Sequence, residues 1–318
     1  MELTPAQQDR AIGAVVASAA GDALGAGYEF GPPLSADTPI VMAGGGSFGW
    51  APGEWTDDTS MAVPILRALA EGRDLAAEET QDAIVAAWVE WVRAAKDVGI
   101  QTRQVLSGLA APTAAAARES ASRVHDAAGR SGGNGSLMRT GPVALGYLRD
   151  GAEVELADVA RALSSLTHWE PDAGDACVLW SLAIRHAVRT GEVDARVGLP
   201  FLGDRSEVWA SRLADAEERE PRDFERNGWV VEALQAAWSA IHGGEGLVDI
   251  LERTVRGGRD TDTVAAIAGA LAGAGRGVSD VPPSWMELLH GFPGVRAADL
   301  ARLAVLASTF GPNGGVTR

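Results

Sequence analysis

Apolar residues recur at every third or fourth position along much of the chain, which is the spacing of one face of an α-helix. The clearest example is residues 82–95, where Trp88 and Trp91 fall on the apolar face of an amphipathic helix. An earlier helix is expected to begin at Thr4-Pro5, a capping-box start with proline at the first helical position. No stretch alternates with a period of two, and no repeat of fixed period is present. The pattern therefore predicts an all-α fold.

The remaining helices are predicted from the same spacing, and one long segment departs from it. Further helices are expected over residues 105–117, 155–166, 172–188, 229–241, 247–255 and 297–307. Residues 203–228 are strongly charged and carry few apolar anchors, so we predict a variable surface excursion there. Because no linker of disordered composition separates two halves, we predict a single domain over residues 1–318.

Two pairs of aspartates stand where predicted helices begin. Asp57 and Asp58 precede a helix that is expected to start at position 59 or 60, because Pro64 is tolerated only near a first turn. Asp260 and Asp262 follow two glycines and lead into a long apolar stretch. Threonines flank both pairs, and carboxylates with hydroxyls are the ligands that a hard cation such as Mg²⁺ or Mn²⁺ prefers.

Helix capping is the simpler explanation of each aspartate pair taken alone. Asp and Thr are favoured at helix N-termini, where they accept hydrogen bonds from free backbone N–H groups. A cap needs only one carboxylate, however, and two like charges packed together are costly unless a cation neutralises them. The residues alone leave both interpretations open: two capped helices, or ligands for two cations if the pairs meet in space.

Residues 129–138 contain several glycines ahead of an apolar stretch. Backbone N–H groups in such a turn can form a nest for an anion such as a pyrophosphate. The stretch is not a Walker loop, because the Gly-Lys-Ser/Thr ending is missing, and it is not a Rossmann fingerprint, because no strand precedes it. A flexible linker is the alternative interpretation.

Three single residues and one loop are further candidates. Glu29 lies between two aromatic residues and is either a surface acid or part of a site. His168 precedes a tryptophan at a predicted helix junction and is either a structural residue or a ligand contact. Cys177 is the one cysteine of the chain, so it forms no intramolecular disulfide and is expected to be a buried thiol. Residues 31–53, rich in proline and glycine, are predicted to form a lid or a pocket wall.

The charge of the chain limits its partners. It has 43 acidic and 27 basic residues, a formal net charge of -16, which disfavours an extended nucleic-acid surface or binding to an anionic membrane. We find neither a basic leader nor an apolar run long enough for a membrane span, so a cytoplasmic protein is expected.

Taken in order, five motifs resemble those of the ADP-ribosylglycohydrolase family. They are Gly21-Asp22-Ala23-Leu24-Gly25 with Glu29, Trp55-Thr56-Asp57-Asp58-Thr59, Gly133-Asn134-Gly135-Ser136-Leu137-Met138-Arg139, Thr167-His168 and Gly258-Arg259-Asp260-Thr261-Asp262-Thr263. They occur in the order of the family and span nearly the whole chain.

The resemblance implies a compact single-domain orthogonal helix bundle with two Mg²⁺ or Mn²⁺ ions at the base of a cleft. It implies an enzyme that hydrolyses the bond between ADP-ribose and a modified group, acting on an ADP-ribosylated protein or small molecule and releasing ADP-ribose. The implied metal ligands are Thr56, Asp57, Asp58, Asp260, Asp262 and Thr263. The implied ADP-ribose contacts are Asn134, Gly135, Ser136, Leu137 and His168, and the implied catalytic acids are Glu29 and Asp97, the latter in a turn similar to one of the arginine-specific branch.

Two other classes of function stay open beside this one. A relative that binds ADP-ribose without turning it over would need fewer acids than both clusters supply. A di-metal phosphohydrolase would use similar carboxylates but would cleave a P–O bond. The products distinguish the three classes. The hydrolase releases free ADP-ribose, the binding relative releases no product, and the phosphohydrolase releases AMP or phosphate.

Overall fold

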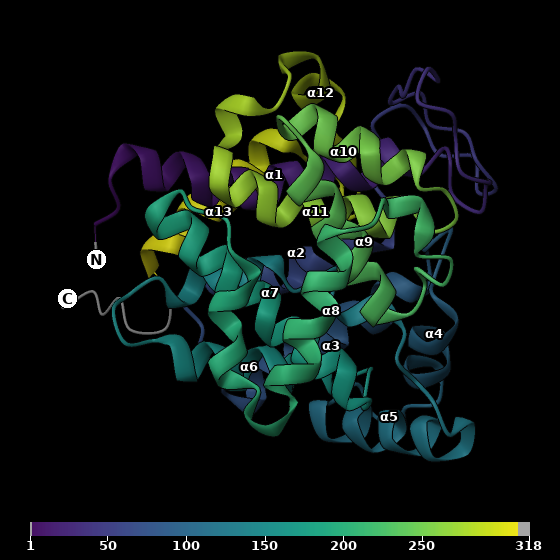
Figure 1. The fold of residues 1–318 in the computed structure, drawn as a ribbon. Helices are drawn as coiled ribbons and strands as arrows, with labels where there is room; N and C mark the ends of the chain where they lie inside the picture. The colour runs from purple at the N-terminus through teal and green to yellow at the C-terminus, as the bar shows by residue number, and fades with distance from the viewer. Residues whose placement is uncertain (1, 311–318) are drawn as a thin grey trace.

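Helices make up nearly all of the regular structure of residues 2–310, the part of the chain that the computed structural model describes, so the prediction of an all-α fold is confirmed (Figure 1). The α-helices are α1 (Pro5–Gly25), α2 (Asp57–Ala70), α3 (Glu78–Val92), α4 (Ile100–Ser107), α5 (Ala114–Ala128), α6 (Glu153–Ser164), α7 (Pro171–Thr190), α8 (Ser206–Glu217), α9 (Val230–Gly243), α10 (Leu247–Arg256), α11 (Thr261–Arg276), α12 (Pro283–Leu288) and α13 (Ala297–Phe310). Short 3₁₀-helices are η1 (Asn134–Ser136), η2 (Gly141–Tyr147), η3 (Ala195–Phe201), η4 (Gly203–Arg205), η5 (Pro221–Asp223) and η6 (Val278–Asp280). Within the same residues, the strands β1 (His290–Gly291) and β2 (Val295–Arg296) form one antiparallel pair.

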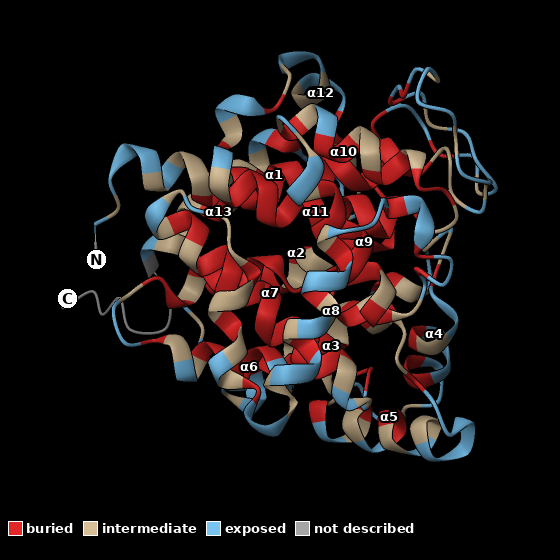
Figure 2. Cartoon of the chain, viewed as in Figure 1, coloured by how far each residue is buried: buried red, intermediate tan, exposed pale blue. Residues whose placement is uncertain are grey.

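The core is built around α1 and α11, which pack against each other in opposite directions at the centre of the bundle (Figures 1 and 2). Glycines make this close approach possible: a Cβ on Gly13 would lie 2.3 Å from the Gly273 carbonyl oxygen, and one on Gly25 would lie 2.5 Å from the Cα of Asp262. The C-terminal end of α1 therefore meets the N-terminal end of α11. This contact brings the motif around Asp22 to the second aspartate pair.

The predicted start of the first helix is confirmed. Thr4 is the N-cap of α1, and its hydroxyl accepts a hydrogen bond from the Gln7 backbone N–H at 3.3 Å. The Gln7 side chain in turn accepts from the Thr4 N–H at 3.0 Å, which completes the capping box.

Two helix boundaries differ from the prediction. Helix α2 begins at Asp57 rather than at position 59 or 60, and Pro64 lies inside it. The Asp22 carboxylate accepts hydrogen bonds from the backbone N–H groups of Thr56 and Thr59, so the entrance of α2 is stabilised from outside the helix. The single helix predicted over residues 105–117 is also wrong: α4 ends at Ser107, and α5 begins only after Pro112, which cannot continue a helix.

Residues 203–228, predicted to be a surface excursion, are packed in part. They form η4, α8 and η5, and the side chains of Trp209, Leu213 and Phe224 are fully buried against the bundle. The end of the segment, at Asn227, is buried as well. These apolar anchors pack the segment against α9, and ion pairs of Arg205 and Arg212 with Asp172 also hold it.

No helix among residues 2–310 combines the length and the apolar character that crossing a membrane requires.

Candidate active site

Three buried aspartates converge from three different helices. Asp22 comes from α1, Asp58 from α2 and Asp262 from α11, and one carboxylate oxygen of each lies within 4.8 Å of one of each of the others. Carboxylate oxygens gathered in this way are a suitable ligand set for a hard divalent cation. The two aspartate pairs of the sequence therefore meet in space, as the metal interpretation requires.

A second group of acids shares one member with the first. Glu29, Asp260 and Asp262 also place carboxylate oxygens within 4.8 Å of one another. Glu29 lies in the turn after α1, and Asp260 is the N-cap of α11. Because Asp262 belongs to both groups, its carboxylate stands between two places where a cation fits.

Several oxygens of these acids are buried without a hydrogen-bond partner. They are Oε2 of Glu29, Oδ1 of Asp58 and Oδ1 of Asp262. A buried carboxylate oxygen without a donor is costly, and a bound cation satisfies it directly. These oxygens are the observation in the structure that fits Mg²⁺ or Mn²⁺ at this place.

The pKa values of the acids are raised. Burial is the main cause of the rise in the pKa of Asp57, from 3.8 to about 8, and in that of Glu29, from 4.5 to about 9. Repulsion by neighbouring carboxylates adds to both shifts, from Asp97 first for Asp57 and from Asp260 first for Glu29. Burial also raises the pKa of Asp58 and of Asp262 well above the ordinary value. So many acids in one place can be ionised together only when positive charge accompanies them.

Asp22 is a further candidate for the site. It stands in one of the five motifs, but no role was predicted for it from the sequence. Its carboxylate accepts hydrogen bonds from Thr56 N–H at 2.8 Å, from Thr59 N–H at 2.9 Å and from the Thr59 hydroxyl at 2.6 Å. It thereby joins α1 to the entrance of α2. The sequence holds one signal for this role, since Asp22 stands in a run of glycine, alanine and leucine. An acid that is buried among small apolar residues needs a partner.

The other acids and threonines predicted for the metal site lie beside the two groups. The Thr56 hydroxyl donates to Asp58 Oδ2 at 2.9 Å, and Thr263 is placed to hydrogen-bond the Asp260 carboxylate. Asp57 is buried next to Asp58, and its Oδ2 accepts a long hydrogen bond of 3.4 Å from the Gly99 N–H. That bond brings the turn of residues 97–99 to the acids. Asp97 itself is half-buried, and its pKa is raised by burial first and also by Asp260.

Strained backbone holds Glu29 against Asp260. Phe30 and Arg259, their respective neighbours, are the non-glycine residues with positive φ in the described chain, at 63° and 66°. The Phe30 N–H donates to the Arg259 carbonyl at 2.6 Å, and the Arg259 N–H donates to the Gly31 carbonyl at 2.7 Å. Left-handed conformations of such residues cost about 1–3 kcal/mol each and persist where surrounding contacts impose them. Here they fix two acids that come from opposite ends of the sequence.

The glycine stretch forms the short helix η1 next to the acids, so it is not a flexible linker there. The Asn134 side chain donates to Asp260 Oδ2 at 2.8 Å and to the Asn227 carbonyl at 3.0 Å. Asn227 also accepts from the Asp260 N–H at 3.2 Å. The sequence reasoning missed Asn227, and a lone asparagine in a charged segment offered no signal for it.

The remaining residues predicted to contact ADP-ribose surround the same turn. Ser136 and Leu137 are buried. The Ser136 hydroxyl accepts a hydrogen bond of 2.9 Å from Ser164, and the Leu137 N–H donates to the Asn134 carbonyl at 2.9 Å, so both groups already have partners within the fold. The ring of His168 lies over the turn, because a Cβ on Gly133 or Gly135 would come within 3.3 Å of its Nε2. Gly135 therefore belongs to the same surface as His168.

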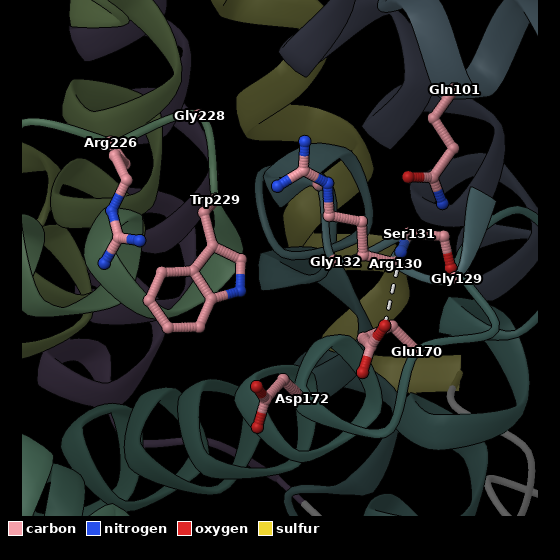
Figure 3. Close-up of a pocket in the computed structure, with 11 residues that line it drawn as sticks. Gln101, Gly129, Arg130, Ser131, Gly132, Glu170, Asp172, Arg226, Gly228 and Trp229 are labelled. Atoms are coloured by element: carbon pink, nitrogen blue, oxygen red, sulfur yellow. Dashed lines mark hydrogen bonds between the residues drawn. The ribbon is translucent and has the colours of Figure 1, made fainter. Parts of the chain in front are cut away.

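A cavity of about 540 Å³ opens beside the turn (Figure 3). Its walls are Gln101, Gly129, Arg130, Ser131, Gly132, Gly133, Glu170, Asp172, Arg226, Gly228 and Trp229. Figure 3 shows Trp229 and Arg226 on one side, Gln101 and Ser131 on the other, and Asp172 at the base. Glu170 closes one wall by accepting a hydrogen bond from the Ser131 N–H at 3.2 Å. The volume is that of an ordinary small-molecule site.

The cluster of acids, the turn and the cavity together define a candidate hydrolase site in an all-α protein. A family model described as ADP-ribosylglycohydrolase matches residues 3–313, and the chain belongs to this family. The predicted recognition is thereby confirmed, and so is the prediction that the chain belongs to a family of enzymes.

Individual relatives agree with the family model. The chain is 31% identical over 296 residues to an ADP-ribosylarginine hydrolase of Pseudomonas putida, covering 90% of this chain and 76% of the relative. It is 32% identical over 295 residues to the ADP-ribosyl-[dinitrogen reductase] glycohydrolase of Rhodospirillum rubrum, covering 90% of this chain and 92% of the relative. A solved structure described as an ADP-ribosylglycohydrolase-related protein complex superposes with a TM-score of 0.73 at 27% identity, covering 97% of this chain and all of that one.

Proposed function

We propose that this chain is a metal-dependent hydrolase that cleaves the bond between the distal ribose of ADP-ribose and an arginine side chain, releasing free ADP-ribose. The observation that carries the proposal is Asp262, shared by two groups of buried acids whose unpartnered oxygens fit two cations. The Asn134–Asp260 hydrogen bond joins these acids to a turn suited to a diphosphate. Relatives named as an ADP-ribosylarginine hydrolase and as an ADP-ribosyl-[dinitrogen reductase] glycohydrolase support the linkage to ADP-ribose.

Two Mg²⁺ or Mn²⁺ ions would be held by the two acid groups, which are Asp22, Asp58 and Asp262, and Glu29, Asp260 and Asp262. Asp57, Thr56 and Thr263 complete the proposed set from the helix entrances. When bound, such a pair polarises a substrate oxygen and lowers the pKa of a bound water to near neutrality. The backbone contact between residues 30 and 259 keeps Glu29 beside Asp260 within the second group.

The chain supplies two candidates for proton transfer. Glu29 lies at the edge of the acid groups with one oxygen unpartnered, and Asp97 approaches from the turn that contacts Asp57. A guanidine leaves more readily when a proton is supplied to it, and a positioned carboxyl group can hold and deliver that proton. A serine oxygen is helped in the same way, and it is the resemblance of the Asp97 turn to one of the arginine-specific branch that supports arginine as the acceptor rather than serine.

The turn and the cavity beside it account for recognition of ADP-ribose. The backbone N–H groups of Gly135 and Ser136 suit the diphosphate, since those of Asn134 and Leu137 already donate to the carbonyls of Gly228 and Asn134. Backbone donors remove the need for a lysine patch in a chain of net charge -16. The adenosine end fits the cavity of Figure 3, where Trp229 offers a flat aromatic face. Stacking of a base on an aromatic side chain contributes about 1–3 kcal/mol.

The proposal is tested with peptides that carry ADP-ribose on arginine or on serine. The Mg²⁺-loaded protein is incubated with each peptide, with and without a chelator, and the products are identified by mass. Metal-dependent release of intact ADP-ribose from the arginine peptide is expected. Release of AMP would indicate a phosphohydrolase, and tight ADP-ribose binding without cleavage of either peptide would indicate a binding protein.

A further inference from the structure

Arg139 is a buried cation that forms no salt bridge among residues 2–310, where the Asp57 carboxylate attracts it only at longer range. Its side chain is 1% exposed, and its guanidinium lies 4.1 Å from the ring centre of Trp88. Its shortest hydrogen bond runs from Nη2 to the Thr167 hydroxyl oxygen, at 2.7 Å. Burying a charge without an opposite charge in direct contact is costly, so a residue kept in this state is expected to serve the site near which it lies.

The contact with Thr167 determines the direction of the next hydrogen bond. A guanidinium can only donate, so Thr167 Oγ1 is the acceptor from Arg139. The same oxygen lies 2.7 Å from His168 Nδ1, and the single hydroxyl proton is free to point there. The opposite arrangement, with a proton on Nδ1, would leave a buried hydroxyl proton without an acceptor, which costs about 1–3 kcal/mol. Nδ1 is therefore the acceptor.

A neutral imidazole that accepts at Nδ1 carries its proton on Nε2. The charged form is disfavoured, because burial first and the nearby charge of Arg139 second hold the pKa of His168 well below its ordinary value. The ring is thus a neutral donor with one defined direction.

His168 Nε2 faces the turn that separates the acids from the cavity. It would lie 3.2 Å from a Cβ on Gly135 and 3.3 Å from one on Gly133, so both glycines leave room for the ring. Within residues 2–310, Nε2 makes no hydrogen bond, and it is not among the enclosed polar atoms that lack a partner. It is therefore open to a ligand that lies on the turn.

We propose that Arg139 and Thr167 are positioning residues that fix His168 as its neutral Nε2–H tautomer, so that Nε2 donates a hydrogen bond to a phosphate oxygen of ADP-ribose on the turn. The phosphate partner rests on the proposed function, whereas the tautomer does not. The buried charge of Arg139 acts behind this donor, because it selects the tautomer through Thr167 and adds attraction for an anion. His168 thus offers a hydrogen-bond donor to the doubly charged diphosphate, and no mobile cationic side chain has to lie beside the carboxylates.

The tautomer is measured on ligand-free, ¹⁵N-histidine-labelled protein by long-range ¹H–¹⁵N correlation, with His168 assigned from the loss of its signals in His168→Gln. The wild-type spectrum is expected to show a protonated Nε2 and an unprotonated Nδ1. A protonated Nδ1 in the wild type would overturn the inference, whatever the protein binds.

Two matched variants test the relay. Thr167→Val keeps the shape of the side chain but removes the hydroxyl, and it is expected to populate the Nδ1–H tautomer and to weaken ADP-ribose binding about tenfold, the value of one hydrogen bond. Thr167→Ser keeps the hydroxyl and is expected to retain the wild-type tautomer and affinity. Equal tautomers and affinities in the Thr167→Val variant and the wild-type protein would contradict the relay.

Arg139→Met tests the first member of the relay, because it frees Thr167 to accept from Nδ1 and is expected to give a mixture of tautomers. If this variant does not fold, the wild-type spectrum and the Thr167 pair still decide the question. A wild-type protein that shows the Nε2–H tautomer but does not bind ADP-ribose would contradict the proposed function and leave the tautomer assignment intact.

Discussion

Glu29 has a carboxylate oxygen that is buried and unpartnered at the edge of the acid groups, which is costly unless the residue serves the site. Glu29→Gln keeps the size of the side chain and removes its capacity to transfer a proton. We expect the rate to fall by about 10²- to 10⁴-fold, while the thermal stabilisation by Mg²⁺ is largely retained. Steady-state kinetics and thermal melts of the same preparation measure both. Wild-type activity in this variant would return Glu29 to the role of an ordinary acid.

Asp262 is the residue on which both acid groups depend. A cation at about 100 times its dissociation constant stabilises the native state by about 2.7 kcal/mol, and Asp262→Asn should abolish most of that gain. Asp126→Asn is the matched control, since it removes the same charge from an exposed position outside the site. Melting curves with and without Mn²⁺ make the comparison. A metal-dependent shift in Asp262→Asn equal to that of the control would contradict the shared ligand.

At the residue scale, the doubled clusters drew attention to four aspartates, whereas two residues that act through distant partners received no role from the sequence. Asp57, Asp58, Asp260 and Asp262 were conspicuous because each has an acidic neighbour. Asp22 and Asn227 act through partners that are distant in sequence, Thr56 and Asp260, and no local spacing reveals such partners.

At the scale of elements, the site depends on how closely α1 approaches α11. A Cβ on Gly25 would lie 2.5 Å from the Asp262 Cα and backbone nitrogen, so Gly25→Ala must push the helix ends apart. Overpacking of this kind costs about 1–3 kcal/mol, and it should also weaken metal binding because Asp22 and Asp262 separate. Gly108→Ala is the control, since the nearest atom to its Cβ would be 3.8 Å away. Denaturant unfolding and metal titration of both variants test this, and equal stability and metal affinity would refute it.

Element types were predictable from the sequence, whereas some boundaries were not. Periodicity and a capping box placed α1 correctly, because those signals are local. The start of α2 was misplaced because its entrance is stabilised by Asp22 of another helix, and that contact overrides the preference of Pro64 for a first turn. The apolar spacing across residues 105–117 predicted one helix, whereas the chain forms two helices that are separated by a segment containing Pro112.

At the scale of the whole molecule, gathering so many buried acids makes the metal-free fold sensitive to pH. The folded pKa of Asp57, about 8, lies above its ordinary value of 3.8, so the native state binds a proton more tightly than the unfolded chain. Stability is therefore highest at low pH within this window and falls as the pH rises from about 4 to about 8. Unfolding in chelator across this range should show the decline, and Mg²⁺ should reduce it. A free energy of unfolding that rises over the same interval would contradict the charge balance inferred for the site.

Every role proposed for the acids depends on Asp262 lying between two cations. The most direct measurement is anomalous diffraction from crystals grown with Mn²⁺. We predict two peaks in the anomalous map, one against Asp22, Asp58 and Asp262 and one against Glu29, Asp260 and Asp262. A map with no peak at Asp262, from crystals in which the acids are well ordered, would contradict the account.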